Sequence, residues 1–269
     1  MNLHPITKVL KKDLIELSKD GALIFTLLII PVLFSVIFPL LLFLFGTRKE
    51  LTVGIAGLTS FLGQIKVIGI PDNIRQDAAP LYAIFTYFFL PLFMLIPVTI
   101  ATILASSSFI GEKEHKTLEG LLYTPISKRN LILGKALSCG LPSILITVVA
   151  VFIYSILVNV FGWQYFGHII LPNFSWILVT VFISPLLVFL SILLIIWSSQ
   201  YVKTSKSAQS VAMLLVAPIF GMIVSQSTGA LIIGLKETVI LIATLMILSL
   251  FLFLFVSKHF DFEKFMLNL

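Results

Sequence analysis

Six long stretches of the chain are apolar enough to cross a lipid bilayer, and they constrain the fold more than any other feature of the sequence. A helix needs about 20 mostly apolar residues to cross the hydrocarbon core, and it bonds its own backbone groups there without water. The stretches are Ala22–Gly46, Ala83–Ile110, Leu131–Phe161, Phe174–Ser199, Val211–Gly234 and Thr238–Ser257. We therefore expect an all-α, polytopic membrane protein with six transmembrane helices.

Composition supports the same class of protein. Of the 269 residues, 59% are hydrophobic and only 11% are charged, whereas soluble domains carry roughly a quarter charged residues. The spans use up most of the chain, so we expect a single transmembrane domain over residues 1–269. The net charge of +6 is scattered over short loops, which does not indicate a nucleic-acid partner.

The segment before the first span predicts a helix that lies on the membrane surface. Over residues 3–20, apolar residues recur at helical spacing and lysines occupy the other side. The apolar positions are Ile6, Val9, Leu10, Leu14 and Leu17. The N-terminal segment is therefore expected to be an amphipathic, interfacial helix.

The distribution of basic residues predicts the orientation. With the N-terminus inside, the connections and tails on that side hold most of the Lys and Arg residues, and the outer segment Gly162–Asn173 holds none. Cytoplasmic segments carry the excess of basic residues in membrane proteins. We expect a multi-pass protein of the cell (plasma) membrane with both termini in the cytoplasm.

Several local features of the spans predict how they bend and pack. Prolines fall inside the first five spans, where membrane helices tolerate them as kinks. In the fifth span Ala217, Gly221, Ser225 and Gly229 recur every four residues, a spacing that lets helices approach closely. This spacing fits packing within the subunit as well as contact with a second subunit. The fifth and sixth spans are expected to be joined by Leu235–Glu237, and the outer segment Thr47–Pro80 to form short interfacial helices.

The spans offer almost no ionisable group of the kind that marks an intramembrane enzyme or a proton-coupled carrier. Lys135 is the nearest case, and it is expected to reach the interface from the start of the third span. The only Gly-Lys pair is followed by Ala136, so the chain lacks the P-loop that binds ATP. Lone Cys139 and the four histidines show no metal-ligand spacing. We expect no catalytic residue, no metal and no bound cofactor in this chain.

The most informative segment is the cytoplasmic loop between the second and third spans, residues 111–130, with the start of the third span. Its sequence is GEKEHKTLEGLLYTPISKRN. Glu112, Lys116 and Glu119 share one helical face, while Leu118, Leu121 and Leu122 form an apolar ridge. Pro125 would end this short helix, and Ser127 would cap the third span.

An amphipathic helix of this kind predicts a protein partner. It could also rest on lipid, but three glutamates within residues 112–119 would be repelled by an anionic inner leaflet. We therefore expect the helix to dock onto another protein, with the lipid-bound position as the alternative.

This segment resembles the signature of the type-2 ABC transporter permeases, approximately E-x-E-x-G-T-x-E-x-L-L-x-T-P-[IV]-S-[KR] followed by L-x-x-G-K. The matching residues are Glu112, Glu114, Thr117, Glu119, Leu121, Leu122, Thr124, Pro125, Ile126, Ser127, Lys128, Gly134 and Lys135. Lys116 stands where the family usually has Gly. The signature covers about a tenth of the chain, and the N-terminal helix and six-span layout are also similar to the family.

The resemblance implies the partners and the mechanism. It implies two six-helix subunits around a translocation path, as a homodimer or a heterodimer of permeases in the membrane lipid, each seated on an ATP-binding cassette ATPase subunit. ATP and Mg would be used by that ATPase, and the chain would be the permease of an exporter. The residues that contact the ATPase, as the coupling helix, would be Glu112, Glu114, Thr117, Glu119, Leu121, Leu122 and Pro125.

Two other functions are considered for the same architecture, a membrane scaffold and an ion channel. A membrane scaffold or assembly factor could use the same cytoplasmic helix to hold a partner without transporting anything. An ion channel is disfavoured, because the spans lack charged residues to line a pore.

Overall fold

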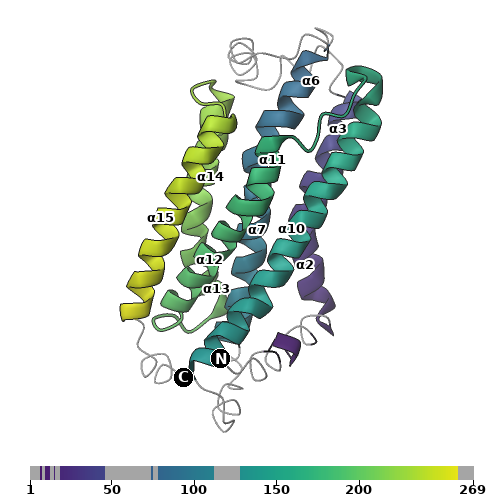
Figure 1. Ribbon diagram of the computed structural model, residues 1–269. Coiled ribbons are helices and arrows are strands. Elements are labelled where there is room, and N and C mark those ends of the chain that lie inside the picture. Colours follow the sequence, from purple (N-terminus) through teal and green to yellow (C-terminus); the bar gives the residue numbers. More distant parts are fainter. Residues whose placement is uncertain are drawn as a thin grey trace.

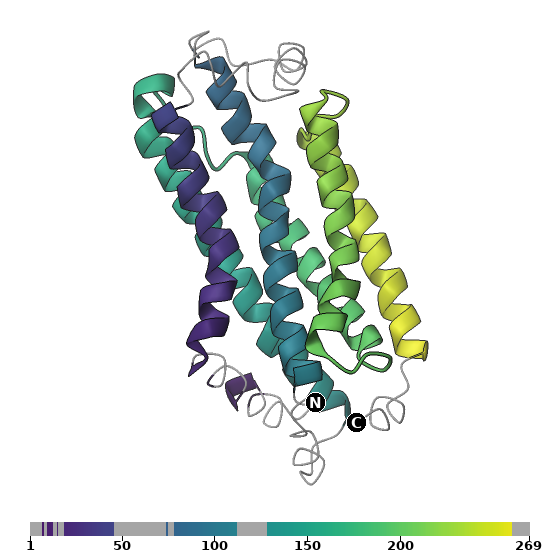
Figure 2. The same cartoon turned by 180° about the vertical axis from the view of Figure 1, so that it is seen from behind.

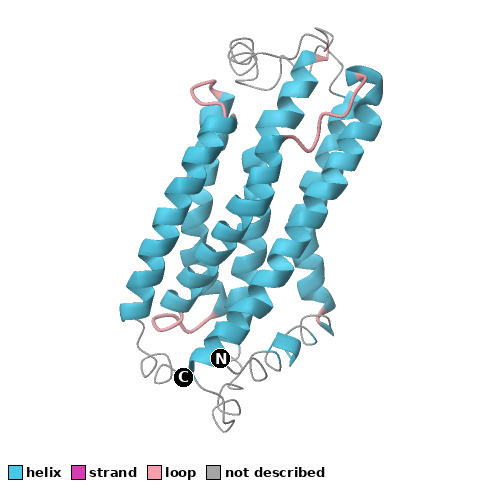
Figure 3. Cartoon of the chain, viewed as in Figure 1, coloured by secondary structure: helices cyan, strands magenta, loops and turns pink. Residues whose placement is uncertain are grey.

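The computed structural model describes residues 7, 10–12, 15, 19–45, 74, 78–111 and 128–259, and within them every regular element is a helix (Figure 3). Six helical segments among these residues are long and apolar enough to cross a membrane. They run side by side in one bundle (Figures 1 and 2). The prediction of an all-α membrane protein with six spans is confirmed.

Most spans consist of several helical pieces. The first span comprises α2 (Gly21–Val32), η1 (Leu33–Ile37) and α3 (Phe38–Phe45), and the second α6 (Ala79–Ala83), η2 (Ile84–Phe88), α7 (Phe89–Ser106) and η3 (Ser107–Gly111). The third is α10 (Lys128–Phe166), and the fourth comprises α11 (Phe174–Leu178), η4 (Val179–Ile183) and α12 (Ser184–Ser198). The fifth comprises α13 (Ser205–Ala212), η5 (Met213–Leu215) and α14 (Val216–Ser227), and the sixth is α15 (Leu235–His259).

The two ends of the bundle differ in what they carry. α2 begins, η3 ends, α10 begins and α15 ends at the lower end in Figure 1, which we call the stem end. The turns over residues 167–173 and 228–234 lie at the opposite end, which we call the loop end. The first span begins at the stem end and the last span ends there. This is what an even number of spans requires, because each pair of spans crosses the bundle and returns.

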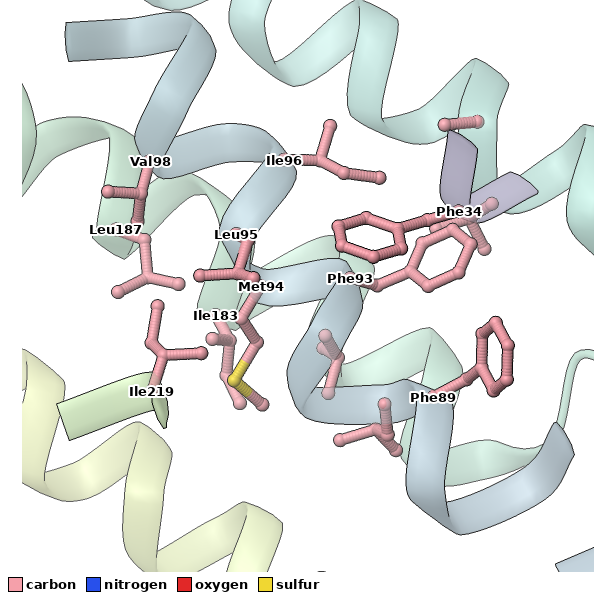
Figure 4. Close-up of a cluster of buried hydrophobic side chains, with 14 of the residues drawn as sticks. Phe34, Phe89, Phe93, Met94, Leu95, Ile96, Val98, Ile183, Leu187 and Ile219 are labelled. Atoms are coloured by element: carbon pink, nitrogen blue, oxygen red, sulfur yellow. The ribbon is translucent and has the colours of Figure 1, made fainter. Parts of the chain in front are cut away.

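The second span lies at the centre of the bundle. Of its most apolar stretch 78% is buried, against 11% in the sixth span. α7 packs against α12 and α10 above all, and Figure 4 shows its residues Phe93, Met94 and Ile96 among side chains of the neighbouring spans. The outer helix α15 exposes most of its apolar side chains, as expected of a helix surrounded by lipid.

Prolines accompany four of the five non-α turns in the described spans, and η3 is the exception. A proline at position i leaves the carbonyl of residue i−4 without its α-helical N–H donor. For Pro39, Pro91, Pro185 and Pro218, the residue at i−4 lies inside a π-helical or 3₁₀ turn in each case, and these residues are Ser35, Tyr87, Val181 and Leu214. A π-helical turn lets such a carbonyl bond to the N–H five residues on. Pro31, Pro97 and Pro142, by contrast, lie inside the α-helices α2, α7 and α10.

Three other spans donate side-chain hydrogen bonds to the π-helical turn η2. The Tyr154 hydroxyl of α10 donates to the carbonyl of Phe85 at 2.8 Å, and the Trp176 indole N–H of α11 donates to that of Thr86 at 2.9 Å. The Gln226 amide of α14 donates to the carbonyl of Tyr87 at 3.3 Å. Consecutive carbonyls of one turn thus bind the third, fourth and fifth spans to the second.

The fifth span begins and ends earlier than Val211–Gly234, the range predicted for it. Thr204 caps its start by accepting from the Ser207 N–H at 3.2 Å. Gly229 ends it with φ +73, and the Gly229 N–H bonds to the Gln226 carbonyl at 3.0 Å, a left-handed helix end that glycine allows. The prediction of Leu235–Glu237 as the connection is therefore wrong, because these residues form the first turn of α15 and residues 228–234 make the connection.

The stripe of small residues in the fifth span does not pack inside the subunit at its centre. Ala217 and Gly221 are exposed, and a Cβ built at Gly221 would meet no atom within 4 Å. Gly229 serves the helix end instead. The sequence left two explanations open for the stripe, packing within the subunit and contact with a second subunit. The exposure of Ala217 and Gly221 excludes packing within the subunit at the centre of the stripe.

Two predicted segments lie largely outside the described residues. Of the interfacial helix 3–20, residues 7, 10–12, 15, 19 and 20 are described, and all of them are helical except Asp20, which caps α2. The amphipathic, surface-bound position of this helix stays a prediction. Of the outer segment 47–80, residues 74 and 78–80 are described, and α6 already begins at Ala79.

Candidate functional site at the stem end

The predicted partner-binding residues belong to residues 112–127, which lie outside the described residues. They are Glu112, Glu114, Thr117, Glu119, Leu121, Leu122 and Pro125. The structure does describe the two helices that flank this segment, because η3 ends at Gly111 and α10 begins at Lys128. η3 and the start of α10 are therefore the two helices through which residues 112–127 are covalently joined to the membrane bundle.

The first flank, η3, is a π-helical turn anchored by apolar side chains. Phe109 and Ile110 are buried in the core. π-Helical turns are rare and occur often at functional positions. The preceding residue, Ser106, is also buried, and its hydroxyl donates to the carbonyl of Ile103 at 2.9 Å. The flank is thus held in the bundle up to its last described residue.

Lys135 of α10 contacts η3 directly. Its side chain is only 3% exposed, its Nζ donates to the carbonyl of Ser108, and the Nζ lies 5.7 Å from the centre of the Phe109 ring. The prediction that Lys135 reaches out to the interface is therefore wrong. The carbonyls near a helix C-terminus carry partial negative charge, and the Lys135 ammonium is bound to one of them instead.

The start of α13 contacts the same turn from another span. The Gln209 side-chain amide donates to the Ser106 hydroxyl at 2.9 Å, and the Ser205 hydroxyl donates to the Ser106 carbonyl at 3.4 Å. A Cβ built at Gly111 would lie 3.7 Å from Ser205 Oγ. The end of the second span is therefore in contact with α13 as well as with α10.

We call this group of residues the stem junction; it comprises Ser106, Ser108, Lys135, Ser205 and Gln209. Its geometry suits mechanical transmission. A displacement of η3 must either carry α10 and α13 with it or break these hydrogen bonds. Within the described residues there is no group of three or more His, Cys, Asp or Glu that could hold a metal ion.

The sequence identified part of the junction. Lys135 stands out in the sequence as an ionisable residue in a span and as part of the Gly-Lys pair. Ser205 and Gln209 were missed, because the fifth span was predicted to begin at Val211. The signal that could have found them is Thr204, a residue type that commonly caps a helix, ahead of a polar first turn.

Some polar groups in the spans that could have faced a substrate are used within the fold. The Asn159 carbonyl oxygen accepts from the N–H groups of Ile170 and Leu171 at 3.0 and 3.2 Å, and its amide donates to the Leu171 carbonyl. The Thr99 hydroxyl donates to the Leu95 carbonyl of its own helix at 2.8 Å. Asn159 therefore ties the loop-end turn to α10.

A groove beside Asn159 lies between α10 and the fourth span. It has a volume of about 450 Å³, and its lining includes Phe152, Ser155, Ile177 and Val181. Most of these side chains are apolar. Groups of this kind fit lipid chains and many amphipathic molecules equally, so the groove does not identify a substrate.

Comparison with known proteins places the whole bundle in one family. Residues 7–262 match the family model described as ABC-2 family transporter protein. The match includes all six spans, the stem junction and the segment 112–127. No curated protein matches the chain significantly.

Proposed function

The chain belongs to the ABC-2 family of transporter proteins and is the membrane permease of an ABC transporter, and from this premise we propose that a separate ATP-binding subunit drives it as an exporter. The family match over residues 7–262 carries the proposal. The partner ATPase, which uses ATP and Mg, would dock onto the amphipathic helix Glu112–Leu122. A second permease subunit, identical or different, would complete the translocation path.

The stem junction supports this mechanism. The acidic, leucine-ridged segment connects to η3 on one side and to α10 on the other. η3 is in turn hydrogen-bonded to α10 through Ser108 and Lys135, and Ser106, the residue just before η3, is hydrogen-bonded to α13 through Gln209. Closure of the ATPase subunits would therefore push on three spans through one short segment and rotate them as rigid bodies.

Leucine truncation tests the docking helix. Interface energy is usually concentrated in a few buried anchors, so Leu121→Ala and Leu122→Ala should each weaken association with the ATPase by about 1–3 kcal/mol. Leu250→Ala is the matched control, because Leu250 lies on α15 and is 61% exposed toward the surroundings of the bundle. Binding would be measured between the purified permease in nanodiscs and its ATPase.

Charge reversal tests the acidic face of the same helix. Glu112→Lys with Glu114→Lys should reduce association by placing like charges against basic groups of the ATPase, and the loss should shrink as salt is raised. Glu112→Gln with Glu114→Gln removes the charge without reversing it and should have a smaller effect. All these variants should insert and fold normally, because the segment is outside the spans.

A scaffold function is the outcome that would replace this proposal. The decisive variant combines Leu121→Ala and Leu122→Ala with Glu112→Lys and Glu114→Lys. If this variant still bound its ATPase and transported normally, residues 112–122 would not be the docking site. If the wild-type complex bound its partner but showed no ATP-driven change in the membrane bundle, the chain would act as a scaffold.

A further inference from the structure

Lys135 is the only charged residue among the five of the stem junction, and it donates a hydrogen bond to the backbone of another span. Its Nζ donates to the carbonyl of Ser108, inside η3, across 27 positions of sequence. Hydrogen bonds from a charged donor are about twice as strong as those between neutral groups. With its side chain 3% exposed, little competing water reaches this bond.

The position of this bond is what gives it a function. Ser108 lies three residues before Gly111, the last described residue ahead of segment 112–127, and Lys135 lies seven residues after Lys128, the first residue of α10. Seven residues of helix correspond to about 10 Å. The ammonium thus joins the helix that enters the segment to the helix that leaves it, one to two turns inside the bundle.

We propose that Lys135 is a positioning residue that clamps the two flanks of segment 112–127 together, so that force on this segment moves η3 and α10 as one unit. The inference rests on the proposed function for its consequence in transport. Without the clamp, η3 would bend at its π-helical turn, and the displacement would be lost before it reached α13 through Ser106 and Gln209.

A series of substitutions at Lys135 separates the bond from simple packing. Lys135→Arg keeps the charge and a long donor, Lys135→Gln keeps a shorter neutral donor, and Lys135→Met keeps only similar volume. The control is Lys206→Met, because Lys206 is exposed on α13 and loses the same charge at the same end of the bundle. A clamp predicts graded effects in the order Arg, Gln, Met, with none for Lys206→Met.

The first measurement needs no partner and no substrate. Hydrogen exchange of the peptide covering residues 106–111 would be followed in the full-length permease in nanodiscs. Loss of a charged donor should speed exchange there roughly tenfold in Lys135→Met, with little change in Lys135→Arg. Equal exchange in the wild type and in all three variants would overturn the clamp, and this result would say nothing against the transport function.

The second measurement follows transmission through the complex, purified by a tag on this chain. In the wild type, ATP with vanadate should change hydrogen exchange of residues 205–212 at the start of α13. In Lys135→Met this change should fall at least threefold while ATP hydrolysis continues, and Lys135→Arg should restore it. An unaltered response in Lys135→Met would refute the clamp, whereas absence of any response in the wild type would refute the proposed function instead.

If Lys135→Met proves too unstable to purify, Lys135→Gln carries the same two tests. A variant that folds, loses the clamp and still transmits the ATP response would show that Lys135 only supports packing.

Discussion

The side-chain amide of Gln226 donates to the carbonyl of Tyr87 at 3.3 Å, and that carbonyl is the one whose α-helical donor would be residue 91, a proline. The fifth span therefore supplies a donor for a carbonyl that lacks its usual one in the second span. Buried carbonyls that have lost a donor gain stability in a membrane from a side-chain donor of a neighbouring helix, and Gln226, which fills this role opposite the turn, is fully buried.

A double-mutant cycle tests this relationship. Gln226→Met should cost about 1 kcal/mol of stability, because it leaves the carbonyl of Tyr87 without the side-chain donor. In a Pro91→Ala background a backbone N–H becomes available, so the same substitution should cost at least ~0.5 kcal/mol less. Stability would be measured by unfolding in mixed micelles, with Gln164→Met on the exposed part of α10 as control. Additive effects would contradict the explanation.

The Tyr154 hydroxyl offers a second, simpler test. Tyr154→Phe removes only the group that donates to the Phe85 carbonyl at 2.8 Å, in a fully buried position. We expect a loss of about 1–2 kcal/mol in the free energy of unfolding. The control is Tyr201→Phe, since Tyr201 is 60% exposed and should change stability by less than about 0.5 kcal/mol. Equal effects of the two substitutions would show that the buried bond adds nothing.

Cysteine labelling tests the orientation. Cysteines in place of Gln164, near the loop end, and of Lys203, at the stem end, should react with membrane-impermeant reagents from outside and inside respectively. Both positions are exposed. Gly167 is unsuitable because its φ of +68 would strain a cysteine, and native Cys139 is buried and should stay unlabelled. Labelling of both sites from one side would be incompatible with the bundle.

The exposed stripe on α14 predicts where a second permease subunit binds. Gly221→Leu adds a side chain where the subunit has open space, so the stability of the single subunit should not fall. If this face meets a second permease, association should weaken at least about tenfold, because close approach depends on small residues. Val224→Leu, at an exposed position one turn away, is the control. The measurement is the dimer fraction in lipid by single-molecule photobleaching, and an unchanged fraction would assign the contact to another face.

The sequence was sufficient for the span count and the end-to-end arrangement, because apolar length is a direct requirement of the bilayer. It was also sufficient to mark Pro91 and Pro185 as points of irregular geometry. The side-chain donors that reach η2 come from other spans, however, and no local pattern in the sequence indicates that Gln226 or Trp176 lies opposite η2. Such contacts depend on how the helices rotate and pack.

The error at the fifth span had a specific physical cause. The polar turn Ser205–Ala212 is too hydrophilic to look like part of a span, so the apolar run alone suggested a start at Val211. In the structure its Gln209 and Ser205 are directed to the end of the second span, where they find partners. The position of Lys135 was misjudged for a related reason, since a lysine near a helix end can turn outward or inward, and only the neighbouring η3 decides between them.

The central position of α7 has a consequence for how the protein is made. A chain inserted from its N-terminus places α7 in the bilayer before α10, α12 and α14, the helices that later cover it, have been synthesised. During that interval α7 must be stable in lipid with only the first span as a possible neighbour. Two of its three hydroxyls help to meet this requirement by bonding to carbonyls of their own helix, Thr99 to Leu95 and Ser106 to Ile103. The donors that later reach its carbonyls at η2 come from helices made afterwards, so assembly proceeds by later spans docking onto an earlier one that is already in place.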